Sequence, residues 1–148
     1  MRKRAVTMCL FVGLLAAGAA QPAGQPPEAA PATHVVGSMS DLMVKIIYPT
    51  SDAIFYITTR SPKNEAEWNE VEGKALMLAE SANLLTMPGR ARDQDRWMKD
   101  TALLLDAGTA AYRAAKRRDV EALAGLNDAL YASCVTCHQH YRPNYGRR

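Results

Sequence analysis

Aromatic residues, cysteines and an excess of charge of either sign are all scarce in this chain. Only 7% of the 148 residues are aromatic, whereas 48% are hydrophobic, with Ala and Leu supplying most of the apolar side chains. This composition favours helices over a β-sandwich or barrel, and the length allows one hydrophobic core. Without Arg2, Lys3 and Arg4 the 18 basic residues fall to 15, which equals the number of acidic ones. A net charge of zero argues against a nucleic-acid partner.

The first 20 residues have the pattern of a secretory signal peptide. A basic run at residues 2–4 precedes an apolar stretch at residues 5–20 that ends in small side chains. We expect cleavage near Ala20 and export to the periplasm, an oxidising compartment. The alternative is an uncleaved membrane anchor, for which this apolar stretch is short.

A segment rich in proline and alanine follows the predicted signal peptide. Four prolines fall between Pro22 and Pro31, and such a segment can neither hold a regular helix nor bury much surface. We therefore interpret residues 21–37 as a tether and residues 38–148 as the folded domain.

The first predicted helix begins at a capping box, Ser38-x-x-Asp41. Apolar side chains at helical spacing continue as far as Tyr48. Pro49 interrupts this pattern, which leaves two alternatives: one kinked helix, or a second helix that begins near Asp52.

Three further segments predict helices with apolar residues at heptad spacing. They cover about residues 64–87, 93–118 and 119–142. In the segment at residues 93–118, the apolar face carries small residues from Gly108 onwards. Such residues allow close approach of a neighbouring helix or of a flat ligand. Four amphipathic helices joined by short turns predict an all-α fold, an antiparallel four-helix bundle.

The motif that carries chemistry is C-x-x-C-H, formed by Cys134, Cys137 and His138. It is the attachment sequence for c-type haem: the two thiols bind the vinyl groups of one porphyrin, and the imidazole binds the iron. A dithiol redox site is an alternative, but such sites usually lie at a helix start after a strand. A zinc site would need a second cysteine pair, which the chain lacks beyond its leader.

The run from Cys134 to Arg142 has the form C-x-x-C-H-x-x-Y-R, which resembles the ending of the cytochrome c prime family. The resemblance covers residues 38–143 and implies an exported four-helix bundle with one covalent haem c near its C-terminus. It makes Cys134 and Cys137 the thioether residues and His138 the proximal iron ligand. Arg142 would lie beside the proximal face or a haem propionate, or else serve only as a charge at the helix end. Family members are often antiparallel homodimers.

The resemblance leaves the sixth iron ligand open. Low-spin relatives of the family use a Met from the first helix, where this chain has Met39 and Met43 one turn apart. We predict Met43, because Met39 would directly follow the Ser38 cap, where a helix frays most. The third alternative is a site with no sixth ligand.

Two functions follow from these alternatives. A haem with His and Met ligands predicts electron transfer with a redox partner protein. An open or apolar distal side predicts binding of nitric oxide or carbon monoxide instead. A peroxidase-like enzyme would need an acid or base near the iron, and neither His34 nor His140 is placed for that, so we expect no enzymatic activity.

Overall fold

The structure is a computed structural model that describes residues 33–144. The predicted signal peptide and most of the predicted tether lie outside these residues. Within them, none of the helices combines the length and the apolar character that crossing a membrane requires.

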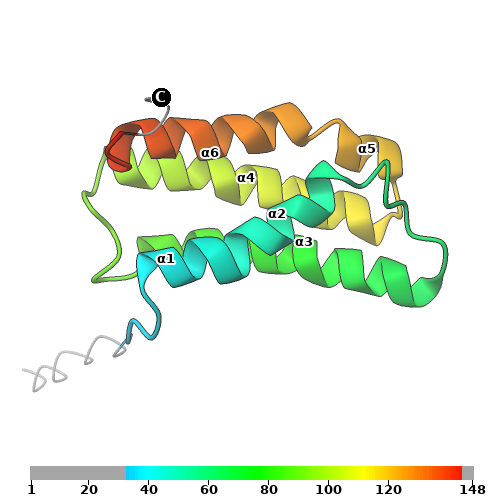
Figure 1. Ribbon diagram of the computed structural model, residues 1–148, viewed down its shortest axis with the longest axis horizontal. Coiled ribbons are helices and arrows are strands. Elements are labelled where there is room, and N and C mark those ends of the chain that lie inside the picture. The colour runs from blue at the N-terminus through cyan, green and yellow to red at the C-terminus, as the bar shows by residue number, and fades with distance from the viewer. Residues whose placement is uncertain (1–32, 145–148) are drawn as a thin grey trace, which may run out of the picture. The chain divides into compact units, whose positions relative to one another are not determined.

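The described part of the chain contains helices and no strand, which confirms the predicted all-α class (Figure 1). In chain order the helices are α1 (Met39–Leu42), the π-helical turn η1 (Met43–Ile47), α2 (Tyr48–Phe55), α3 (Glu65–Thr86), α4 (Arg96–Lys116), α5 (Val120–Ala124) and α6 (Asn127–Tyr141).

The first three elements form one continuous rod, so the alternative of a second helix beginning near Asp52 is wrong. Pro49 has no N–H, and in a regular α-helix its ring would collide with the carbonyl four residues earlier. Just before it the chain widens into η1, where the N–H of Tyr48 donates to the carbonyl of Met43. The Thr50 hydroxyl lies 2.7 Å from the carbonyl oxygen of Ile46, to which it donates. The structure thus accommodates the proline through a wider turn and a side-chain hydrogen bond.

The π-turn decides which side chains of the rod face inward. In a regular α-helix, residues twelve apart differ in direction by about 120°. One extra residue in a turn reduces that difference to about 20°. Leu42 and Ile54 are twelve apart on either side of η1, and both are buried, with 3% and 0% of their surface exposed. The two halves of the rod therefore pack against the same core.

The helix starts follow the sequence closely. Both hydrogen bonds of the capping box are present: the Ser38 side chain accepts from the N–H of Asp41, and the Asp41 side chain accepts from the N–H of Ser38. The side chain of Asn64 likewise accepts a hydrogen bond from the N–H of Glu67. Asp119 caps α5 through the N–H of Ala122, as expected of a helix start. The expectation of one helix over residues 119–142 is wrong, because the chain leaves the helix after α5 and resumes it in α6.

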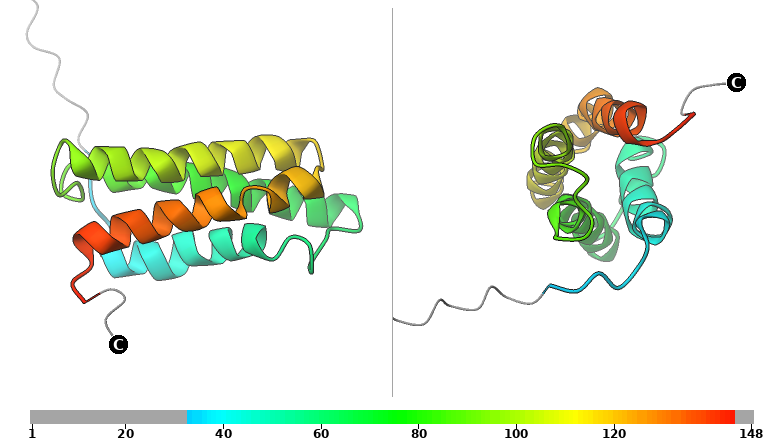
Figure 2. Two further views of the ribbon diagram at one scale, coloured as in Figure 1. Left: turned by 90° about the horizontal axis from the view of Figure 1, so that it is seen from above. Right: turned by 90° about the vertical axis from the view of Figure 1, so that its left-hand side faces the viewer.

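Helices that follow one another in the chain also pack side by side. Extensive contacts join α3 to α4, α4 to α6 and α2 to α3, and the end-on view in Figure 2 shows the rod between α3 and α6. At Gly108 in α4, a Cβ atom would lie only 2.7 Å from the Cα of Ala79 in α3. At Gly108 the missing side chain thus allows the close approach of a neighbouring helix.

Candidate functional site

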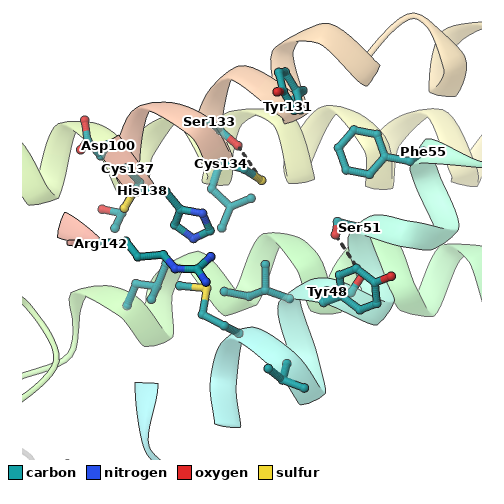
Figure 3. A pocket seen from close by; sticks show the side chains of 16 residues that line it. Tyr48, Ser51, Phe55, Asp100, Tyr131, Ser133, Cys134, Cys137, His138 and Arg142 are labelled. Carbon is teal, nitrogen blue, oxygen red and sulfur yellow. Dashed lines mark hydrogen bonds between the residues drawn. The ribbon is translucent and has the colours of Figure 1, made fainter. Parts of the chain in front are cut away.

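A cavity of about 660 Å³ lies between α4, α6 and the rod formed by α1, η1 and α2 (Figure 3). Its volume is within the range of about 300–1,000 Å³ typical of cofactor and ligand sites. Most of its lining is apolar, including Ile47, Phe55, Leu85 and Leu104. The charged and imidazole groups of the lining, Asp100, His138 and Arg142, come from α4, the end of α6 and the residue after it.

The structure brings the predicted site residues to this one cavity. Cys134, Cys137, His138 and Arg142 line it from α6 and the residue after it, and Met43 lines it from the rod. Met39, the other methionine considered as a ligand, does not belong to the lining of this cavity. It lines a smaller hollow near the start of the rod instead.

The surroundings of Cys134 and Cys137 raise the pKa of both thiols. Burial raises the pKa of Cys137 to about 11, with further contributions from the negative charge of Asp100 and from Cys134. Burial also raises the pKa of Cys134. Reactive dithiol redox sites need a lowered thiol pKa, so the raised values disfavour that alternative to haem attachment. The described residues hold no group of three or more His, Cys, Asp or Glu side chains able to bind a metal ion.

His138 is held as a neutral imidazole. Burial lowers its pKa, and the positive charge of Arg142 lowers it further. Neutral imidazole is the form that binds a metal through a ring nitrogen. Figure 3 shows the side chain of Arg142 beside that of His138. The backbone N–H of Arg142 donates to the carbonyl oxygen of His138, with 2.9 Å between nitrogen and oxygen. Both roles predicted for Arg142 are compatible with this position.

The last turn of α6 is held by side chains of α4 and of Asp93, which lies three residues before α4. Nδ1 of His140 lies 2.7 Å from Oδ2 of Asp100, and the hydroxyl of Tyr141 donates to Asp93. The ring of Tyr141 packs edge-on against Trp97, with 4.8 Å between the ring centroids. The backbone that carries the C-x-x-C-H motif is therefore held in place by contacts outside the motif.

Asp100 is the residue of this site that the sequence analysis missed. Only 4% of its surface is exposed, and it lines the cavity beside the cysteines. A signal for it does exist in the sequence. Asp100 lies three residues after Trp97 and four before Leu104, which places a carboxylate on the apolar face of a helix.

The wall formed by the rod offers mostly apolar contact. The rod contributes to the described lining Met43, Val44, Ile47, Tyr48, Ser51 and Phe55, of which only Tyr48 carries a titratable side chain. The Ser51 hydroxyl donates to the carbonyl of Tyr48 at 3.0 Å, so its proton is already used within the helix. This wall is suited to ligation by the thioether of Met43 or to an apolar contact.

The cavity opens to solvent between the rod and α6. Val44, Tyr48 and Tyr131 line it while remaining 63%, 67% and 62% exposed. A flat cofactor in the cavity would present one edge at this opening.

No family model, curated protein or solved structure matches this chain. The interpretation of the site consequently depends on the motif and on the geometry described above.

Proposed function

We propose that the protein is an exported c-type cytochrome that carries one covalent haem and transfers electrons, and that its helices form an antiparallel four-helix bundle. The observation that supports this most directly is the common cavity. A C-x-x-C-H motif from α6 and a methionine from the rod line one mostly apolar space of about 660 Å³.

The residues present fit a haem group. Cys134 and Cys137 would form the thioether bonds, His138 would bind the iron, and Met43 would supply a further ligand to it. When bound, haem supplies a metal centre that gains and loses one electron. The surrounding apolar side chains limit the access of water, which affects the potential of such a centre.

Met43 is the better candidate for the sixth ligand because it lines the cavity and Met39 does not. Binding of nitric oxide or carbon monoxide to an iron without a sixth ligand is the second candidate function. The apolar wall around Ile47 and Phe55 favours it, since such a wall admits a small gas without offering a competing ligand.

Covalent attachment is the first point to test. The protein is produced in a host that matures c-type cytochromes, and haem is followed on a denaturing gel and by acid–organic extraction. We expect haem to remain with the wild-type chain and to be lost when Cys134 and Cys137 are both replaced by Ser. Haem extracted from the wild-type chain would contradict the proposal.

The identity of the sixth ligand is tested by absorption spectra of the ferric and ferrous forms, with and without carbon monoxide. We expect Met43→Ala to convert the spectrum from low-spin to high-spin and to open the iron to carbon monoxide. Met39→Ala is the matched control and should leave the spectrum unchanged. A wild-type spectrum in the Met43 variant would make the gas-binding function the preferred one.

The remaining proposals concern the setting of the protein. We propose a periplasmic location after cleavage near Ala20, a redox protein as partner and no catalytic activity of its own. N-terminal sequencing of protein from the native host tests the cleavage, and a start at Met1 in exported material would contradict it. Pairing of two copies as in family members is tested by measuring the mass in solution.

A further inference from the structure

Asp100 presents a carboxylate to a cavity that is otherwise mostly apolar. Only 4% of its surface is exposed, and it comes from α4, near the attachment end of α6. Removing a carboxylate from water is costly unless hydrogen bonds compensate it. A packed apolar residue would avoid that cost, so the presence of this charge calls for a reason.

The hydrogen bond from His140 holds the carboxylate in place. Nδ1 of His140 lies 2.7 Å from Oδ2 of Asp100, a distance typical of a hydrogen bond to an ionised acceptor. About 34% of the side-chain surface of His140 is exposed, against 5% for Asp100. The imidazole therefore covers the carboxylate from the solvent side, while the carboxylate itself lies in the cavity wall.

The charge of Asp100 already acts on groups at the attachment end of the cavity. Asp100 lines the same cavity as Cys134 and Cys137, and its negative charge contributes, after burial and Asp93, to the raised pKa of Tyr141. Interactions across a buried region are weakly screened by salt and by water. A redox centre attached to Cys137 would experience the same charge.

We propose that the carboxylate of Asp100 lowers the reduction potential of the haem. This inference rests on the proposed function. Reduction adds one electron from an external redox protein to the ferric iron, and no bond to Asp100 forms or breaks. A fixed negative charge nearby stabilises the ferric form more than the ferrous form, because the ferric iron carries one more positive charge. Asp100 thus acts on the potential through its charge, without binding the iron.

The alternative role for Asp100 is purely structural, as a fastening between α4 and α6. The two roles are separated by Asp100→Asn, which removes the charge and keeps an oxygen that accepts from Nδ1 of His140. Asp106→Asn is the matched control, since Asp106 lies on the same helix and is exposed. Asp100→Ser is a second neutral variant with a different hydrogen-bonding geometry.

The measurement is the midpoint potential of each purified holoprotein at neutral pH, with absorption spectra and melting temperatures recorded alongside. We expect the midpoint potential to rise in both Asp100 variants and to stay unchanged in Asp106→Asn. The absorption spectra of all three variants should remain those of the wild type. An unchanged potential in either Asp100 variant with a wild-type spectrum would overturn the inference. So would a failure of both variants to retain haem, because Asp100 would then be a structural residue. A wild-type chain without covalent haem would instead refute the proposed function.

Discussion

Two glycines in neighbouring helices show how strongly the surroundings of one residue decide the effect of a substitution. At Gly108 an added Cβ would lie 2.7 Å from the Cα of Ala79, and a backbone atom cannot move aside as a flexible side chain would. At Gly73, apart from its chain neighbours and the backbone of its own helix, no atom lies within 4 Å of the added Cβ. The intrinsic gain from replacing glycine by alanine in a helix is the same at both positions, about 1 kcal/mol.

We therefore expect the same substitution to have opposite effects. Gly73→Ala should raise the free energy of unfolding by up to about 1 kcal/mol. Gly108→Ala should lower it by about 1–3 kcal/mol, because overpacking at the α3–α4 contact outweighs the gain in helix propensity. Urea unfolding followed by circular dichroism measures both. Equal stabilisation by the two variants would show that the helices approach each other less closely at Gly108.

At the scale of single residues, the sequence predicts the site where the chemistry is local. Cys134, Cys137 and His138 lie within five consecutive positions, so one stretch of helix brings them together whatever the rest of the chain does. The pairing of His140 with Asp100 joins residues 40 positions apart. Such a contact depends on how α4 packs against α6, and no pattern within either segment contains that information.

Among the helices, the π-turn is the feature with the clearest consequence for packing. It contains about one residue more than an α-turn, and it ends at Ile47, two residues before Pro49. If that extra residue exists to accommodate the proline, the two can be removed together. The rod would then run as a regular α-helix and still turn the same side chains toward the core.

We expect a variant that lacks Lys45 and carries Pro49→Ala to fold with a free energy of unfolding close to that of the wild type. Lys45 is exposed, and its ion pair with Asp41 is a surface pair worth at most about 1 kcal/mol. Deleting Lys45 alone should cost about 3 kcal/mol, because Pro49 would then lie inside a regular helix. Thermal and urea unfolding of the two variants tests this.

The control is the deletion of Met77, an exposed residue within the regular helix α3. This deletion rotates the following side chains by about 100° relative to those before it, so we expect a loss of cooperative folding. If the double change at Lys45 and Pro49 proved as damaging as the deletion of Met77, the π-turn would have another cause.

The elements themselves were predicted well where capping residues mark them, and less well where packing decides. Ser38 caps a helix as expected, and Asn64 and Asp119 cap helices at the predicted starts of their segments, because a cap needs only neighbouring residues. The π-turn was not predicted, since the sequence shows only a proline within an apolar pattern. Whether a helix breaks, kinks or widens there depends on the core that its second half must reach.

For the molecule as a whole, the cavity predicts a core that is complete only when a group such as the proposed haem fills it. One cluster of buried apolar side chains runs through the rod, α3, α4 and α6, and within it Trp97 donates its indole N–H to the carbonyl of Leu85 at 2.9 Å. The cavity of about 660 Å³ lies between the rod, α4 and α6, and α3 contributes only Leu85 to its described lining. The all-α class was predictable from composition and periodicity, but the position of the cavity depends on tertiary packing.

Replacement of both Cys134 and Cys137 by Ser should therefore destabilise the protein unevenly. A group bound only to the folded state stabilises it, and its loss leaves the cavity between the rod, α4 and α6 unfilled. We expect a lower melting temperature, retained far-ultraviolet circular dichroism and stronger binding of a hydrophobic dye. In hydrogen exchange, the amides of α3 and α4 should stay protected while those of the rod and α6 exchange faster. The holoprotein is the reference, and equal loss of protection in all helices would show that the cofactor supports the α3–α4 contact as well. Unchanged protection throughout would mean that the helices close the cavity by themselves, and that the core does not depend on what fills it.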